Sequence, residues 1–222
     1  MNFNSDLQIW IPAQGASQRI PDKNFRPFYD GQSLLEIAIR KLLKVTVGSN
    51  LFVSSESPLA AVICDDLGVN FIKREGVLLG NKIKQKELFD HFIDNTPESK
   101  YVGWIQVTDP LFFDYSEFFS YRPIPEEVYV VATEIKKHAF FKGFPVNFNF
   151  GDWHPVTQDI EPIIVPRWSA FFAQRATFCR FKYHFGKYNN FYIANDEFVD
   201  IDYEGDFQLA QRLYQLSIEK GL

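Results

Sequence analysis

Short apolar runs alternate with segments of helical periodicity along the first half of this 222-residue chain. We expect strands at 7–12, 50–55, 69–73 and 101–107, and helices at 32–44, 56–67 and 84–93. Strands that alternate with helices of this length form right-handed β-α-β crossovers. The pattern therefore predicts an α/β fold with a mostly parallel sheet sandwiched by helices.

The second half of the chain is less regular. We expect further strands at 127–135, 169–173 and 190–194, and helices at 177–183 and 206–220. Residues 136–166 are rich in aromatic residues, proline and glycine, with little helical period. A long irregular stretch in a compact domain usually has a function or is covered by a partner. We expect one domain over 1–222, with 136–166 as an extension from it.

Composition excludes some classes of function. A net charge of −5 disfavours a nucleic-acid-binding surface. A signal-peptide pattern and an apolar run of membrane-spanning length are both missing from the sequence, so we expect a soluble, cytoplasmic protein. Cys64 and Cys179 lack metal-ligand spacing and are expected to be free thiols, and His138 and His154 are expected to pack rather than bind metal.

The loop after the first strand has the composition of a phosphate-binding loop. Small and polar residues fill 13–18, and Arg19, Lys23 and Arg26 follow. Successive backbone N–H groups in such a loop can converge on phosphate oxygens, and the cations can neutralise the phosphate charge. The loop has one glycine and matches neither common glycine-rich pattern, so the signal is moderate.

Two further sets of residues follow strand ends, where open α/β sheets bind ligands. Arg74 follows the third expected strand, Thr108 and Asp109 follow the fourth, and Gln106 lies near the end of the fourth. The alternatives are a solvated arginine at 74 and an ordinary Asp-Pro turn at 109–110.

An acidic pair, Asp200 and Asp202, lies two residues apart and so on one side of an extended segment. Like charges this close repel unless a cation lies between them, and Mg²⁺ prefers one or two carboxylates together with phosphates. The alternative is a helix cap, because Asp202 or Glu204 could start the helix expected at 206–220.

Three motifs resemble one family. Ile-Pro-Ala-x-Gly-x-Ser-x-Arg-Ile-Pro-x-Lys-Asn at 11–24 resembles the N-terminal signature of the CMP-sialic acid synthetases, or acylneuraminate cytidylyltransferases. The segment 106–111 resembles their Leu-Gln-Pro-Thr-Ser-Pro-Leu-Arg segment, and Asp-Ile-Asp with Asp-Phe-x-Leu-Ala at 200–210 resembles their closing signature. This chain departs from the family pattern at four positions, which hold Gln14, Gln18, Asp109 and Phe112 instead of Arg, Lys or Arg, Ser, and Arg.

The resemblance implies a Rossmann-like nucleotidyltransferase that joins CTP to a nonulosonic acid with Mg²⁺, releasing pyrophosphate. It implies catalytic roles for Arg19, Lys23 and Asp202, and a metal site at Asp200 and Asp202. The implied nucleotide-binding residues are Ala13, Gln14, Gly15, Ala16, Ser17, Asn24 and Arg74. The implied sugar-binding residues are Gln106, Thr108, Gln158 and Arg167. The resemblance also implies a homodimer in which 136–166 forms much of the interface and reaches the partner's sugar site.

Two alternatives remain open. One is a sister enzyme that activates a different ulosonic acid, such as Kdo, pseudaminic acid or legionaminic acid. The other is a non-catalytic nucleotide-sugar binding protein of the same fold. Gln14 and Gln18 favour the second alternative, whereas Asp200 and Asp202 argue against it.

Overall fold

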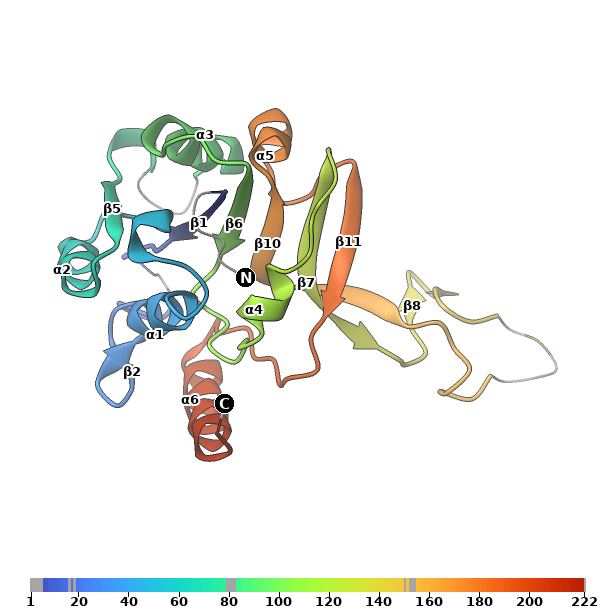
Figure 1. The fold of residues 1–222 in the computed structure, drawn as a ribbon. Helices are drawn as coiled ribbons and strands as arrows, with labels where there is room; N and C mark the ends of the chain where they lie inside the picture. Colours follow the sequence, from blue (N-terminus) through green and yellow to red (C-terminus); the bar gives the residue numbers. More distant parts are fainter. Residues whose placement is uncertain are drawn as a thin grey trace.

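A seven-stranded sheet runs through the molecule (Figure 1). The computed structural model describes residues 6–15, 17, 19–78, 83–149, 151 and 155–221. The strand order is β11-β7-β10-β6-β1-β4-β5. The strands are β1 Leu7–Pro12, β4 Leu51–Ser55, β5 Asn70–Lys73, β6 Tyr101–Ile105, β7 Glu127–Ile135, β10 Ile163–Gln174 and β11 Tyr188–Ile193.

Most neighbouring strands are parallel. β1 pairs in parallel with β4 and β6, β4 with β5, and β11 with β7. β10 runs antiparallel to β6 and to β7. The prediction of a mostly parallel α/β sheet is confirmed, and β10 joins its two parallel parts.

Helices cover both faces of the sheet. α1 (Leu34–Leu42), α2 (Pro58–Leu67), α4 (Tyr115–Phe118) and α6 (Glu204–Glu219) pack with Ile9 and Ile11 of β1 in one core. α3 (Gln85–Asn95) and α5 (Arg175–Phe181) pack with Trp10 in the other. Trp10 stacks on Phe92 of α3 with ring centroids 5.3 Å apart. Because side chains alternate along a strand, β1 supplies both cores.

Several elements begin and end where local chemistry predicts. Ser33 Oγ accepts the Glu36 N–H at 3.2 Å, and Glu36 accepts the Ser33 N–H at 2.7 Å, so a capping box starts α1. α2 begins at Pro58 rather than residue 56, because Ser57 is its N-cap. Gly68 ends α2 at φ +65°, a conformation that glycine adopts without strain.

The sequence did not predict the short elements. These are the hairpin of β2 (Pro27–Tyr29) and β3 (Gln32–Ser33), the hairpin of β8 (Phe140–Phe141) and β9 (Phe144–Pro145), α4, and 3-10 turns at Gly48–Asn50 and Gly76–Leu78. The expected strand 101–107 ends at Ile105, and the helix expected at 177–183 is α5, which starts two residues earlier.

The strand expected at 169–173 is part of the much longer β10. The prediction of irregular structure up to 166 is therefore wrong from Ile163 on. The pairing with β7 shifts register between Pro166 and Phe171, and Trp168 has φ +58°. This irregularity, together with Pro166, breaks the alternation by which a strand is recognised from sequence.

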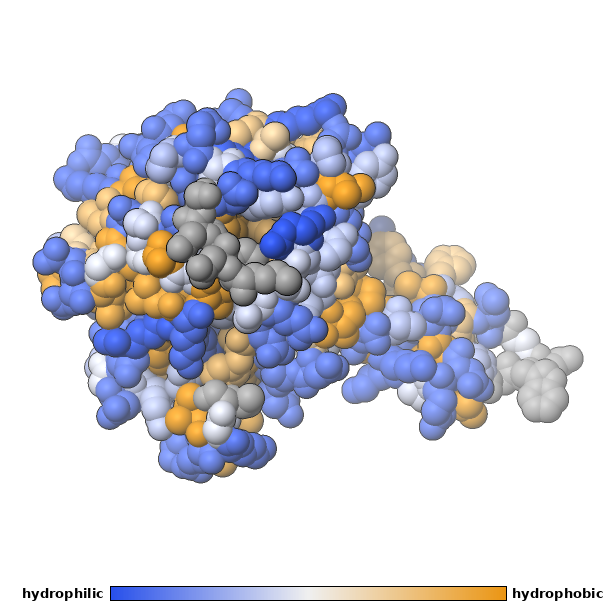
Figure 2. Space-filling model, viewed as in Figure 1, coloured by the Kyte–Doolittle hydropathy of each residue, from blue (hydrophilic) through white to orange (hydrophobic). Residues whose placement is uncertain are grey.

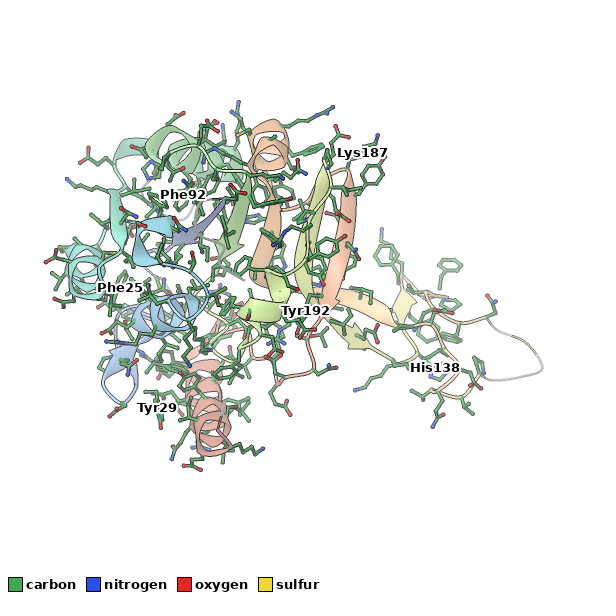
Figure 3. All side chains as sticks on the ribbon, viewed as in Figure 1. Phe25, Tyr29, Phe92, His138, Lys187 and Tyr192 are labelled. Atoms are coloured by element: carbon green, nitrogen blue, oxygen red, sulfur yellow. The ribbon has the colours of Figure 1, made fainter. Side chains whose placement is uncertain are left out.

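Residues 136–162 project from the sheet beyond the ends of β7 and β10 (Figure 1). Figure 2 shows apolar residues at the surface of this extension. Phe141 and Phe144 of the β8–β9 hairpin are 67% and 75% exposed. His138, labelled in Figure 3, contacts the Pro155 carbonyl through Nε2 at 2.8 Å, while His154 lies outside the described residues.

Both cysteines are free, as expected. Cys64 is buried, and burial raises the pKa of its thiol to about 12. Cys179 is half-buried. In the part of the chain that the structure describes, no helix combines the length and apolar character needed to cross a membrane.

An aromatic cage encloses His184. The rings of Trp104, Phe171 and Phe89 lie 4.9, 4.7 and 5.3 Å from the imidazole, centroid to centroid. Neither ring nitrogen has a hydrogen-bond partner among the described residues. Burial without a partner disfavours the imidazolium and lowers the pKa of His184 from 6.5 to about 4.

The burial of His184 in this cage predicts that the protein is less stable in acid. Between pH 6.5 and about 4, the unfolded chain binds a proton at His184 that the folded chain does not. The free energy of unfolding should therefore decrease as the pH falls, by up to about 3 kcal/mol from this residue. His184→Phe should lose less stability than wild type between these pH values, measured by denaturant unfolding.

The same comparison at about pH 8 is the control for packing changes, because the His184 imidazole of the wild type is then neutral in both the folded and the unfolded chain. Equal loss of stability in both proteins from pH 6.5 to 4 would contradict the prediction.

Candidate functional site

A pocket of about 550 Å³ opens at the carboxyl ends of β1, β5 and β6. β1 pairs in parallel with β6 and with β4, and β4 pairs in parallel with β5. The carboxyl ends of these strands therefore lie at one edge of the sheet. The pocket is lined by Pro12, Gln14, Ser17, Arg19, Lys23, Asn24, Arg74, Ile83, Gln85, Leu88, Gln106, Val107 and Thr108. It brings together most of the sequence-predicted nucleotide residues with Gln106 and Thr108.

The loop after β1 is held against the end of β4. The Ala13 N–H donates to the Ser54 carbonyl at 2.9 Å, and the Gly15 N–H donates to Glu56 Oε1 at 2.8 Å. A Cβ at Gly15 would lie 3.1 Å from the Ser57 Cβ, so glycine permits this close approach. Ala16, expected to bind nucleotide, and Gln18 lie outside the described residues.

Asn24 braces the loop from within. Its Nδ2 donates to the Gln14 carbonyl at 2.9 Å, whereas its Oδ1 is buried and has no partner in the described part of the chain. Ser17 Oγ accepts the Ile20 N–H at 3.4 Å. The unpaired acceptor of Asn24 lies beside the pocket, where an N–H donor of a ligand could satisfy it.

Arg74 is the most informative residue of the pocket. Its Nε donates to Ser54 Oγ at 2.9 Å, and its side chain is almost fully buried. Its Nη2 is buried without a hydrogen-bond partner among described residues. Burial lowers the pKa of Arg74 to about 10, although the Glu56 charge opposes this effect. An unsatisfied guanidinium N–H facing a pocket favours an anionic ligand oxygen.

The loop cations contact the acidic pair, which lies far away in sequence. Arg19 Nη2 lies 2.7 Å from Asp202 Oδ1, and Lys23 Nζ donates to the Ile201 carbonyl. Burial lowers the pKa of Lys23, and the charges of Asp202 and Asp200 oppose that effect. Burial and the neighbouring Asp202 charge raise the pKa of Asp200. The segment 200–202 therefore lies beside the predicted phosphate loop.

The helix-cap alternative is wrong for Asp202, whereas Glu204 is the first residue of α6, as that alternative allowed. Asp206 Oδ2 accepts the N–H groups of Asp202 and Tyr203, at 3.1 and 2.7 Å, at the start of α6. Glu204 instead pairs with Arg26 at 2.8 Å. The Asp202 carboxylate thus has no capping role and lies beside the loop cations.

The donor set at this edge fits a magnesium ion that shares its ligands with a substrate. Within the described ranges, no three His, Cys, Asp or Glu side chains gather as a complete metal site. Asp200 and Asp202 supply two carboxylates whose mutual repulsion a cation would relieve. Mg²⁺ commonly takes one or two carboxylates and completes its shell with water and phosphate oxygens.

Two sequence-predicted sugar residues lie apart from the pocket. Gln158 is exposed on the extension. The Arg167 side chain is completely buried and pairs with Asp109 and Asp196. Gln106 and Thr108 do line the pocket, and the Gln106 N–H donates to the Ser169 carbonyl at 2.8 Å.

Sequence reasoning missed Glu56, Gln85 and Leu88. Glu56 follows β4, so the rule that ligands bind at strand ends could have identified it. Gln85 and Leu88 reach the pocket from the first turn of α3, and nothing in the sequence marks that turn as a pocket wall.

Several known proteins are similar to this chain. Residues 9–114 match the family model described as cytidylyltransferase. The chain is 25% identical to the N-acylneuraminate cytidylyltransferase of Streptococcus agalactiae serotype III (strain NEM316), and 24% identical to that of serotype V (strain ATCC BAA-611 / 2603 V/R). Both matches cover 89% of this chain and 50% of the relative. Over residues 9–114 the chain is thus similar to the cytidylyltransferases.

Solved structures share the fold of this chain. A CMP:2-keto-3-deoxy-manno-octonic acid synthetase complexed with CTP superposes with a TM-score of 0.62 at 12% identity, covering 96% of this chain and 100% of that one. The 4-diphosphocytidyl-2C-methyl-D-erythritol synthase of Anaerococcus prevotii DSM 20548 gives 0.59 at 15% identity, covering 95% and 96%. The nucleotidyltransferase fold is thereby confirmed. The chain spans about half the length of the curated relatives it matches.

The unpaired N–H of Arg74 predicts that this residue contributes to anion binding in the pocket. Arg74→Met should weaken the binding of inorganic triphosphate roughly 10- to 100-fold, because it removes a charge-assisted hydrogen bond. Isothermal titration calorimetry measures this change. Lys73→Met is the matched control, since Lys73 is exposed, pairs with Glu75 at 2.6 Å and carries the same charge. A similar loss in both variants would mean that net charge alone attracts the anion.

Proposed function

We propose that this chain transfers the cytidylyl group of CTP to the anomeric hydroxyl of a sialic acid or a related 3-deoxy-2-ulosonic acid. The observation that carries the proposal is the contact of two loop cations with the segment 200–202. Arg19 pairs with Asp202 at 2.7 Å, and Lys23 donates to the Ile201 carbonyl, 178 residues away in sequence. Arg19 and Lys23 belong to one family-like motif and Asp200 and Asp202 to another. Arg19 and Lys23 line the pocket, and Asp202 lies next to it through its contact with Arg19, as a shared active site would require.

The loop side of the pocket suits the nucleotide. The glycine loop (Ala13 to Ser17) would lie along the triphosphate, and the Gly15 N–H would leave Glu56 to donate to a phosphate oxygen. Arg19, Lys23 and Arg74 would neutralise its charge, and the buried Nη2 of Arg74 would gain an acceptor. The side chains of Ser17 and Asn24, together with the loop backbone, would recognise the base.

The acidic pair suits the metal. Asp200 and Asp202 would hold Mg²⁺, which when bound shields charge on the α-phosphate and the leaving pyrophosphate. Arg19 is about half exposed and can turn from Asp202 to a phosphate oxygen. Transfer at phosphorus depends mainly on positioning and charge neutralisation, and these residues supply both.

The side of the pocket formed by Gln106 and Thr108 would bind the acceptor. Gln158 would reach an acceptor bound to a second copy of the chain. The acceptor is a member of the ulosonic acid class, and Kdo, pseudaminic acid and legionaminic acid are alternatives to sialic acid. A non-catalytic nucleotide-sugar binding protein is the second candidate, favoured by the neutral Gln14 in the pocket, where the resemblance expects arginine.

Pyrophosphate release tests the proposal. The protein with CTP, Mg²⁺ and a panel of ulosonic acids should release pyrophosphate with at least one acceptor, and ATP should not replace CTP. Asp202→Asn should lower turnover roughly 10²- to 10³-fold, because it removes a charge needed in the transition state. Asp66→Asn, on the exposed surface of α2, is the matched control.

Near-wild-type turnover of Asp202→Asn at limiting Mg²⁺ would contradict the metal assignment. CTP binding without turnover in the whole panel would support the binding-protein alternative. Recovery of turnover in Gln14→Arg with Gln18→Lys would then show that the missing cations had silenced the site.

We further propose that the chain is a homodimer through residues 136–166. The exposed rings of Phe141 and Phe144 form an apolar surface that monomeric proteins rarely leave in water. A second copy would cover this surface and bring its own Gln158 toward the acceptor.

Light scattering at micromolar concentration should give twice the chain mass of 25.9 kDa. Phe141→Ser with Phe144→Ser should shift the protein toward monomer, because burial of each ring stabilises the interface by roughly 2 kcal/mol. Leu59→Ser, on α2 at the far side of the molecule (Figure 1), is the control. A monomeric wild type would refute the proposal.

A further inference from the structure

A cluster of four charged side chains lies beside the pocket but outside its lining, and three of them, those of Arg167, Asp109 and Lys41, are buried. Arg167 donates from Nε to Asp109 Oδ2 at 3.1 Å and from Nη2 to Asp109 Oδ1 at 3.2 Å. Its Nη1 donates to Asp196, and its Nη2 also donates to the Glu197 carbonyl at 3.1 Å. The side chains of Arg167 and Asp109 are 0% and 2% exposed.

Lys41 of α1 is the second cation of the cluster. Its Nζ donates to the carbonyls of Pro110 and Phe112, the latter at 3.0 Å, and lies 3.7 Å from the centroid of the Phe113 ring. Burial lowers the pKa of Lys41 to about 7, while the charges of Asp109 and Asp196 oppose this effect. Two cations thus hold the turn that follows β6.

The irregularity of β10 directs Arg167 into this cluster. The register shift lies between Pro166 and Phe171, and Trp168, directly after Arg167, has φ +58°. A positive φ is costly for a bulky side chain and persists only where surrounding contacts determine it. The strained residue, Trp168, directly follows Arg167, which makes the bidentate ion pair.

The cluster joins the two segments that the proposed reaction must bring together. Residues 106–112 carry Gln106 and Thr108 at the pocket, and residues 196–202 lead to the acidic pair. Arg167 contacts both segments, through Asp109 on one side and Asp196 with Glu197 on the other. Buried ion pairs contribute little net stability, because desolvation offsets their attraction, so stability alone does not account for this cluster.

We propose that Arg167 is a positioning residue that holds the acceptor side of the pocket in register with the acidic pair. It does so as a rigid link between residues 106–112 and 196–202, rather than as a ligand of the sugar. The effect of this link on turnover rests on the proposed function, whereas its effect on backbone hydrogen exchange does not.

Asp196→Asn tests the link, because it weakens one arm and leaves the Arg167–Asp109 pair in place. Backbone hydrogen exchange should rise by roughly 10-fold or more in peptides covering both 106–112 and 196–202, and should stay unchanged in β1 and α3. Glu126→Gln is the matched control, since it weakens the Arg180–Glu126 pair away from the pocket. Faster exchange confined to 196–202 would overturn the proposal, because the two segments would then be independent.

Steady-state kinetics supply the second readout. Asp196→Asn should lower kcat about 10-fold or more and leave KM for CTP within about twofold, since the nucleotide contacts lie on other segments. Arg167→Lys keeps the charge but not the bidentate geometry, so its kcat and exchange should lie between those of wild type and Arg167→Met. Unchanged kcat in Asp196→Asn would refute the positioning role.

The two proposals can fail separately. If wild type releases no pyrophosphate with any acceptor, the proposed function fails, and hydrogen exchange still decides whether the link exists. If the wild-type protein releases pyrophosphate but hydrogen exchange shows that residues 106–112 and 196–202 move independently, only the proposed link through Arg167 is refuted.

Discussion

The parallel pairing of β1 with β4 and β6 is the interaction on which the rest of the structure depends. All six residues of β1 are buried, with Ile9 and Ile11 in one core and Trp10 in the other. Burial of each such side chain stabilises the fold by roughly 1.5–3 kcal/mol. Since both cores meet on this strand, its carboxyl end has a fixed position relative to the ends of its neighbours. The pocket and its loop form at that edge.

Strand β10 extends this arrangement beyond a simple parallel sheet. It pairs with β6 at one end and continues along β7 into the extension. One strand therefore connects the pocket edge with the segment proposed to meet a second copy of the chain. The irregularity at Trp168 occurs where β10 passes from one environment to the other, and there Arg167 turns inward. The irregularity of β10 at Trp168 and the burial of Arg167 in the charge cluster therefore occur at the same place in the strand.

The cations near the pocket fall into two groups, those able to bind a ligand and those that hold the protein structure. Arg19, Lys23 and Arg74 line the pocket with incomplete or solvent-accessible pairing, which leaves them able to contact an anion. Arg167 and Lys41 have their partners within the protein and lie behind the pocket. A buried cation whose donors face protein acceptors adds rigidity, whereas one with an unsatisfied N–H at a cavity favours a ligand. By this criterion Arg74 and Arg167, both expected to bind substrate, belong to different classes.

The sequence by itself determined the features that depend on neighbouring residues. The Ser33 capping box, the end of α2 at Gly68 and the strand–helix alternation follow from local propensity, and the loop motif marked most of the pocket. Only the tertiary structure decided that Arg167 is buried against Asp109, that Lys23 meets Ile201, and that β10 is twelve residues long. These outcomes depend on contacts between segments far apart in sequence. Such contacts form when the sheet closes and excludes water, so burial and partner choice could not be derived from local periodicity.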